Sequence, residues 1–176
     1  MSLRHAALGL LAAGPASGYD LLRSFQGSLS HVWPATQSQL YAELGRLADA
    51  GLVTVSAEGA RGRKEYALTD AGLAELRHWL TEVEPTMNRR SDMLLRVFFL
   101  GVLDSTAADS YLRQRISASD EYHAELQKVA DSIPDNGSPM ALYGRLAVEW
   151  GLRFTEMQRD WAEWAVAQLR VAQLDQ

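Results

Sequence analysis

The stretch HVWPATQSQLYAELGRLADAGLV, residues 31–53, predicts one helix with an unusual outer face. Leu40, Leu44 and Leu47 fall on one side, at the spacing of a stripe that faces a core. The opposite side and its flanks carry Ser38, Ala42, Gly45, Gln39, Tyr41 and Arg46. Solvent-facing helices are usually rich in Glu and Lys, which form helices well. A small and amide-bearing outer face therefore needs a reason other than solubility.

The composition limits the kinds of partner that the chain can bind. The chain has 176 residues, a formal net charge of −5 and no cysteine. Disulfides and thiolate metal sites are therefore excluded, which agrees with a cytoplasmic location. The acidic balance means that a nucleic-acid hypothesis requires a local cluster of positive charge. No apolar run reaches the roughly 18 residues that span a bilayer, so we expect no membrane segment.

Helix signals come before and after this stretch. We expect a short helix over residues 2–14 and a second one capped by Ser17, whose apolar side holds Tyr19, Leu22 and Phe25. Pro34 and Thr36 open the third helix, and Gly51 closes it in the left-handed conformation. A fourth helix, capped by Thr69, is expected to turn five residues inward: Leu73, Leu76, Trp79, Leu80 and Val83.

Two short β-rich runs, LVTVS and RKEYALT, lie between the third and fourth helices and are joined by AEGARG, which predicts a hairpin. Three helices, a hairpin and another helix form the order of a winged helix-turn-helix domain. A helix that enters a DNA major groove benefits from small outer residues, because its backbone must approach the bases. Among the candidate DNA contacts, we assign base edges or bridging waters to Gln37, Ser38 and Gln39, and phosphates to Thr36 and Tyr41.

The hairpin supplies the positive charge. Arg61, Arg63 and Lys64 lie at or beside a Gly-flanked tip, from which they can reach phosphates or the minor groove. Glu58 and Glu65 dilute this cluster, and in isolation it is typical of solvated loop charges. Together with the helix order, it favours a DNA-binding wing.

The second half of the chain has a different character. EPTMNRRSD, from residue 84, is typical of a linker, which predicts a DNA-binding domain over 1–84 and an α-helical domain over 85–176. DMLLRVFFLGVL, residues 92–103, is apolar nearly all round and predicts a buried helix. A longer helix over 106–133 has a stripe, interrupted around Ser119, of Leu112, Ile116, Leu126, Val129 and Ile133. PDNGSP is a break, with Ser138 as the next cap.

The last helix, from Pro139 to about Leu174, is roughly 50 Å long. Its apolar stripe contains Leu142, Leu146, Trp150, Phe154, Met157, Trp161, Trp164 and Leu169. The preceding helices are too small to cover this stripe, so the simplest partner for it is a second copy of the chain. The aromatic part, Trp150, Phe154, Met157, Trp161 and Trp164, is the candidate dimer interface; the alternative is a pocket for a planar aromatic ligand.

The sequence contains no pattern typical of an enzyme. The four histidines are scattered without metal-ligand spacing, and His78 is expected on a helix surface. No nucleophile-elbow, Walker or dinucleotide motif is present. We therefore expect no catalytic residue, no metal and no cofactor.

Several segments resemble the PadR family of bacterial transcriptional regulators: SGYDLLRSF, WPATQSQLYAELGRLADAGLV, GRKEYALTDAG and SDMLLRVFFLG. The C-terminal helices agree in length and order with the version that has the larger virulence-activator-type domain. The resemblance implies a homodimer that binds an inverted repeat, with Tyr41 in the recognition helix and Arg61, Arg63 and Lys64 in the wing. It also allows release by a phenolic or planar aromatic compound. The chain departs from many relatives at Ala42 and Gly45, where they have bulky or basic residues.

The fold class expected is therefore mainly α with a small β-hairpin wing, an N-terminal winged helix-turn-helix followed by a C-terminal α-helical dimerisation domain. The function expected is a homodimeric, DNA-binding transcriptional regulator, a repressor in our interpretation. The alternative is a winged-helix protein-interaction module without DNA binding, which the acidic balance favours.

Overall fold

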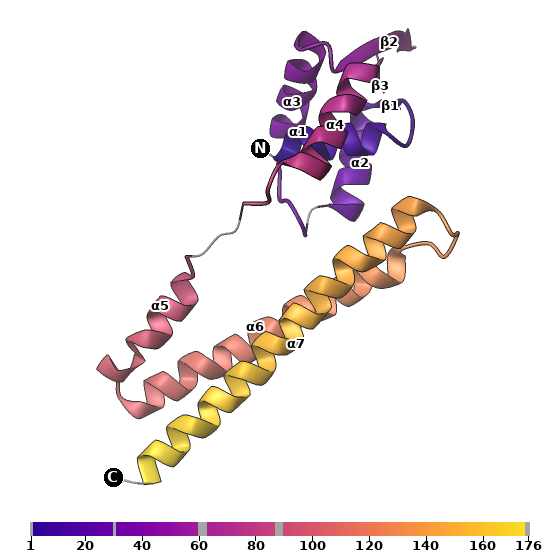
Figure 1. Ribbon diagram of the computed structural model, residues 1–176. Helices are drawn as coiled ribbons and strands as arrows, with labels where there is room; N and C mark the ends of the chain where they lie inside the picture. The colour runs from indigo at the N-terminus through magenta and orange to yellow at the C-terminus, as the bar shows by residue number, and fades with distance from the viewer. Residues whose placement is uncertain (1, 30, 60–62, 87–89, 175–176) are drawn as a thin grey trace. The chain divides into compact units, whose positions relative to one another are not determined.

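The computed structural model describes residues 2–29, 31–59, 63–86 and 90–174. The chain divides into two compact units, Met1–Thr86 and Met87–Gln176, each of which is described by itself (Figure 1). Within the described ranges, no helix combines the length and the apolar character needed to cross a bilayer.

The N-terminal unit has the predicted order of helices and hairpin. Its elements are α1 (Ser2–Leu11), β1 (Ala16–Ser17), α2 (Gly18–Ser28), α3 (Gln37–Asp49), β2 (Val53–Gly59), β3 (Arg63–Leu68) and α4 (Asp70–Glu82). The short strand β1 was not predicted. It pairs antiparallel with β3, Ala16 opposite Tyr66 and Ser17 opposite Glu65, and completes a sheet of order β1-β3-β2. Two residues are too few to show the alternation by which a strand is recognised.

The predicted helix caps are confirmed. Ser17, Thr36 and Thr69 are the N-caps of α2, α3 and α4, and each side chain accepts a hydrogen bond from a backbone N–H of the first turn. Gly51 has a φ of +67° after α3, the left-handed conformation that favours glycine. The helix occupies only 37–49 of the stretch 31–53, because the cap at Thr36 sets its start.

The core of this unit lies between α1, α2, α3 and the sheet. Its buried apolar residues are Ala7, Leu8, Leu11, Leu21, Leu22, Phe25, Leu40, Leu44, Leu47, Val53, Tyr66 and Leu76. The prediction for α2 was wrong at Tyr19, which is 64% exposed, while Leu21 is buried in its place. Leu21, Leu22 and Phe25 follow the helical repeat, and Tyr19 lies outside their face.

The prediction for α4 was wrong at Leu80 and Val83, which are exposed. Gly72 decides which face of α4 is buried. A Cβ on Gly72 would lie 2.1 Å from the carbonyl oxygen of Leu52, so the helix approaches that backbone more closely than a side chain allows. The buried residues are Gly72 and Leu76 in the first two turns; Leu80 and Val83 continue the same side at the end of α4, where no described residue of the unit buries them.

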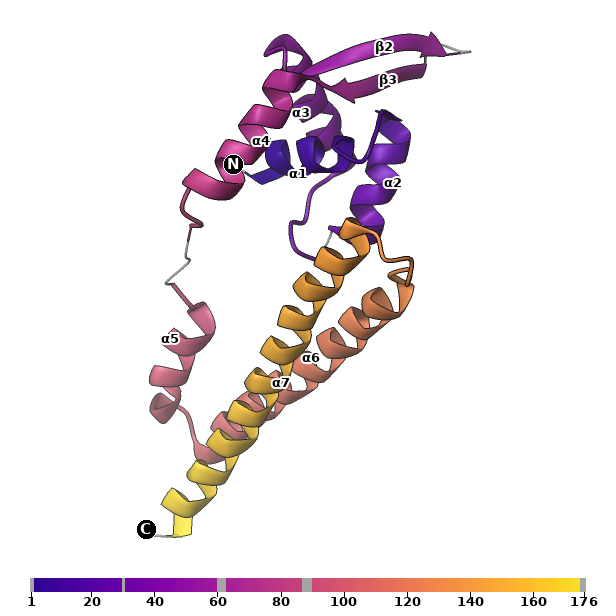
Figure 2. The ribbon, with the colours of Figure 1, turned by 45° about the vertical axis from the view of Figure 1, so that its right-hand side comes forward.

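The C-terminal unit contains α5 (Asp92–Phe98), the 3-10 turn η1 (Leu100–Val102), α6 (Ser105–Ser132) and α7 (Pro139–Leu174). Figures 1 and 2 show α6 and α7 running side by side in opposite directions. The buried positions recur every seven residues, as in a coiled coil: Leu112, Ser119 and Leu126 on α6, and Ala141, Val148, Thr155 and Ala162 on α7. Ser119 thus continues the buried stripe of α6 that we expected it to interrupt.

The prediction of a buried helix over 92–103 was wrong for the single chain. Alpha-helical geometry ends at Phe98, and Leu100 is the buried apolar residue of the segment. Met93 and Val97 are partly buried, and six large apolar side chains are at least half exposed: Leu94, Leu95, Phe98, Phe99, Val102 and Leu103. The remainder of the unit is a pair of helices, which covers only one side of this segment.

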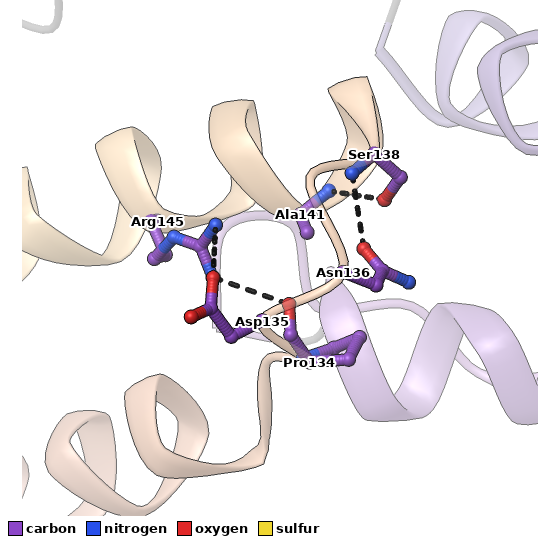
Figure 3. A network of polar contacts seen from close by, with 6 residues as sticks. All are labelled: Pro134, Asp135, Asn136, Ser138, Ala141 and Arg145. Atoms are coloured by element: carbon purple, nitrogen blue, oxygen red, sulfur yellow. Dashed lines mark hydrogen bonds and ion pairs between the residues drawn. The ribbon is translucent and has the colours of Figure 1, made fainter.

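A polar network holds the connection between α6 and α7 (Figure 3). The Arg145 guanidinium donates to the carbonyl oxygen of Pro134 at 3.2 Å and pairs with Asp135 at 3.6 Å. The Asn136 amide oxygen accepts from the backbone N–H of Ser138, and the Ser138 hydroxyl accepts from Ala141 at 3.2 Å. These contacts confirm Ser138 as the cap and stabilise the turn between the two helices.

Candidate nucleic-acid interface

The exposed face of α3 is the first part of the candidate interface. Leu40, Leu44 and Leu47 are buried, and the opposite residues are exposed: Gln37, Ser38, Gln39, Tyr41, Ala42 and Gly45. A Cβ at Gly45 would meet nothing within 4 Å, so this surface is open. The face therefore presents amides and hydroxyls above small residues, as a helix in the major groove requires.

Two of the candidate side chains also hold the start of α3. The Gln39 amide oxygen accepts a hydrogen bond from the backbone N–H of Thr36 at 2.8 Å, and the Thr36 hydroxyl accepts from the backbone N–H of Gln39 at 3.3 Å. This reciprocal arrangement is a capping box. It occupies the oxygen of Gln39, so a contact from this side chain to DNA would come from its NH2 group.

The wing is the second part. In Figure 2, β2 and β3 extend together away from the helices of their unit. They pair as far as Gly59 and Arg63, and Lys64 is exposed opposite Glu58. Arg61 lies outside the described residues, and the structure places Arg63 by its backbone alone. Lys64 is thus the member of the predicted basic cluster whose exposure is established.

The charge of Arg46, on the flank of the outer face, is shared with a neighbour. Its guanidinium pairs with the carboxylate of Glu43, which is 9% exposed. The pair joins the exposed flank of α3 to its buried side. Glu43 therefore compensates part of the positive charge that Arg46 could offer to a polyanion on this flank.

The aromatic stripe of α7 is a separate surface. Tyr143, Trp150, Met157, Trp164 and Val171 recur every seven residues, and each is more than half exposed. At seven-residue spacing these side chains lie on the side of α7 opposite the stripe that packs on α6. We call them the outer stripe. This row of large, exposed apolar side chains is typical of a surface that a binding partner covers.

Phe154 and Trp161 flank the outer stripe. The rings of Trp150 and Phe154 stack at 5.1 Å with an interplanar angle of 8°. Trp161 is partly buried against the cluster of Leu100, Ala108, Leu112 and Val166. The five aromatic and Met residues predicted as one site are therefore divided, because Trp161 belongs in part to the fold of its own subunit.

The two arginines near this stripe are already paired. Arg153 donates to Glu149 at 2.7 Å, and Arg159 pairs with Asp160 at 3.2 Å. The hydrogen bond to each carboxylate raises the pKa of the arginine. These pairs reduce the positive charge that the outer stripe could offer to an acidic ligand.

Three of the four histidines lie in structural contacts. His5 stacks on Trp79 with ring centroids 4.5 Å apart, His78 pairs with Glu82 at 3.2 Å, and His123 bonds the hydroxyl of Thr155 at 2.8 Å. Among the described residues there is no group of three or more His, Cys, Asp or Glu side chains arranged to hold a metal ion.

Known proteins share both units. The profile of the transcriptional regulator PadR-like family matches residues 7–78, and that of the virulence activator alpha C-terminal domain matches residues 89–170. The negative transcriptional regulator PadR of Bacillus subtilis is 31% identical over 143 residues, which is 79% of each chain. The chain belongs to the PadR-like family of transcriptional regulators. A probable transcriptional regulator of Mycobacterium tuberculosis is 30% identical over 93% of this chain and 95% of its own length.

Solved structures of the family share the fold. Bacillus subtilis PadR in complex with operator DNA has a TM-score of 0.82 at 28% identity, covering 96% of this chain and 99% of that one. PadR in complex with p-coumaric acid has a TM-score of 0.84 at 29% identity, covering 97% and 99%. The virulence activator AphA of Vibrio cholerae has a TM-score of 0.81 at 24% identity over 97% and 99%, which supports the fold. The predicted family and fold class are thereby confirmed.

The capping box predicts a difference between two substitutions of Gln39. We expect Gln39→Ala to lower the free energy of unfolding by about 1 kcal/mol, because the backbone N–H of Thr36 loses its acceptor. Gln39→Glu should leave that free energy unchanged, since a carboxylate accepts the same bond. Urea denaturation of both variants measures this, and equal stability of the two would contradict the capping role.

Proposed function

We propose that the chain is a homodimeric transcriptional repressor that binds an inverted-repeat operator through α3 and the wing. The observation that carries the proposal is that one unit contains both the exposed face of α3, which has small residues, and a basic wing. It is supported by the PadR relative, which has been crystallised on operator DNA. A bacterial operator lies in the cytoplasm, so the proposal places the protein there, and the proposed role is binding without catalysis.

The proposal assigns roles as follows. Gln37, Ser38 and the NH2 group of Gln39 read base edges directly or through waters, while Thr36 and Tyr41 contact phosphates. Arg61, Arg63 and Lys64 anchor the wing on the backbone or in the minor groove. One winged-helix unit from each subunit would bind one half-site. Repression would follow from occlusion of the promoter.

Binding to the DNA upstream of its own gene tests the proposal. A mobility shift that survives excess nonspecific competitor is the expected result. A winged-helix module that binds only protein would give no shift with any promoter fragment, even at low salt. That outcome would replace the DNA-binding proposal with its alternative.

The wing contributes positive charge, so its removal should change the salt dependence of binding. We expect the triple variant Arg61→Ala, Arg63→Ala and Lys64→Ala to weaken binding to all sequences. The slope of log K against log salt should become shallower by up to about five, since each phosphate contact contributes about 0.9 and the two wings of the dimer lose three basic residues each. Lys128→Ala, an exposed change on α6, is the control and should leave the slope unchanged. An unaltered slope in the triple variant would remove the wing from the interface.

The dimer is proposed to form on the outer stripe of α7. Trp164 is 59% exposed and lacks the intrachain packing of Trp161, which makes it the cleaner probe. Trp164→Glu should give folded monomers in sedimentation, because a charge at an apolar interface must be desolvated. Gln114→Glu adds a charge at an exposed position of α6 and should remain dimeric. If the Trp164→Glu variant remains dimeric, the dimer interface lies elsewhere.

An aromatic effector is the last part of the proposal. PadR has been crystallised with p-coumaric acid, and the stacked rings of Trp150 and Phe154 are surfaces on which a planar ligand can stack. We expect p-coumaric acid to quench tryptophan fluorescence and to release operator DNA, with a weaker response in Trp150→Leu. If no phenolic compound quenches the fluorescence or shifts the melting temperature, the outer stripe is an interface only.

A further inference from the structure

Gly18, the first residue of α2, lies where the side chain of Tyr41 needs space. A Cβ added to Gly18 would lie 2.6 Å from Cε1 of the Tyr41 ring, 3.2 Å from Cζ and 3.4 Å from Cδ1. These distances show that the ring rests directly on the backbone of the first turn of α2. Gly18 is buried, while Tyr41 remains 39% exposed. The ring is thus supported on one side and open on the other.

The glycine is required for space rather than for backbone freedom. Gly18 begins α2 and, unlike Gly14 and Gly51, does not have a positive φ. Any residue could adopt its backbone conformation, so the constraint is one of space, and the three atoms nearest to an added Cβ all belong to the Tyr41 ring. Gly72 differs, because there an added Cβ would meet the carbonyl of Leu52 at 2.1 Å and the backbone would have to move. At Gly18 only the end of a partly exposed side chain has to move.

The start of α2 is also connected to the wing. Ser17 caps α2, accepting from the backbone N–H of Asp20 at 3.2 Å, and as part of β1 it pairs with Glu65 of β3. Glu65 follows directly after Lys64 in the wing strand. The Ser17–Gly18 step therefore joins two of the proposed DNA-binding elements: β3 on one side and the Tyr41 ring of α3 on the other.

From this geometry we propose that Gly18 is a positioning residue of the DNA interface: the absence of a side chain there sets the place of the Tyr41 ring relative to the wing. The inference rests on the proposed function, since it concerns how α3 meets DNA. A side chain at position 18 would push the ring outward and change the direction of its hydroxyl. The phosphate contact assigned to Tyr41 would then be lost while the core residues of the unit stay in place.

Four variants test this role: Gly18→Ala, Tyr41→Ala, the double variant, and Gly27→Ala as the matched control. Gly27 is also in α2, and a Cβ there would meet nothing within 4 Å. Each full-length protein is titrated against a labelled upstream DNA fragment, and its thermal unfolding is followed by circular dichroism. We expect Gly18→Ala and Tyr41→Ala each to weaken binding about a hundredfold, because the dimer loses one hydrogen bond to a phosphate at each half-site, at about tenfold each, and we expect Gly27→Ala to bind as the wild type.

The double variant separates positioning from general stability. Once Tyr41→Ala has removed the ring, adding Gly18→Ala should cost less than twofold in affinity. An equal loss in both backgrounds, wild-type affinity of Gly18→Ala, or wild-type affinity of Tyr41→Ala would overturn the role. If Gly18→Ala unfolds, the core has not stayed in place, and the positioning role falls whether or not the double variant folds. A wild-type chain that binds no DNA overturns the proposed function itself, which these variant comparisons cannot do.

Discussion

The burial of one face of α3 is the constraint on which the candidate interface depends. Leu40, Leu44 and Leu47 are almost completely inaccessible to solvent and pack with residues of α1 and α2. Burying three leucines contributes several kcal/mol, far more than any one surface contact, so it sets the rotation of the helix about its axis. Once that rotation is set, Ser38, Ala42 and Gly45 must point outward.

The contacts around α3 then adjust its surface in two ways. The capping box fixes the first turn and uses the acceptor oxygen of Gln39, so that only the NH2 donors of this side chain remain for a contact with DNA. The close approach of Tyr41 to Gly18 restricts the ring on one side. The proposed recognition surface is thus built partly from groups that also stabilise the domain, and substitutions there must be compared for both stability and binding.

The C-terminal unit is governed by a different constraint. Small and polar residues occupy much of the buried stripe of α7, including Ala141, Thr155 and Ala162, so the larger residues are left on the opposite face. Close packing of α6 on α7 needs small residues, and aromatic side chains there would hold the helices apart. The outcome in the single chain is an exposed apolar stripe with an exposed α5, which is typical of a subunit that completes its core by assembly.

The local signals were sufficient for most of the fold. Caps at Ser17, Thr36, Thr69 and Ser138, and the stop at Gly51, depend on residue types within a few positions and are readable without any tertiary information. The outward face of α3 follows from helical periodicity in the same way. The family could also be assigned from short segments, because their spacing is specific.

Contacts between segments that are far apart in the sequence could be established only from the tertiary structure. Periodicity shows that Tyr19, Leu80, Val83 and residues 92–103 are apolar, but not which neighbour is available to cover them. The strand β1 exists only because β3 offers it an edge, and Gly18 matters only because Tyr41, 23 positions later, lies against it. The sequence by itself determined where helices begin, end and turn their apolar sides; the tertiary structure decided which of those sides are covered, since coverage depends on packing between residues far apart in the chain.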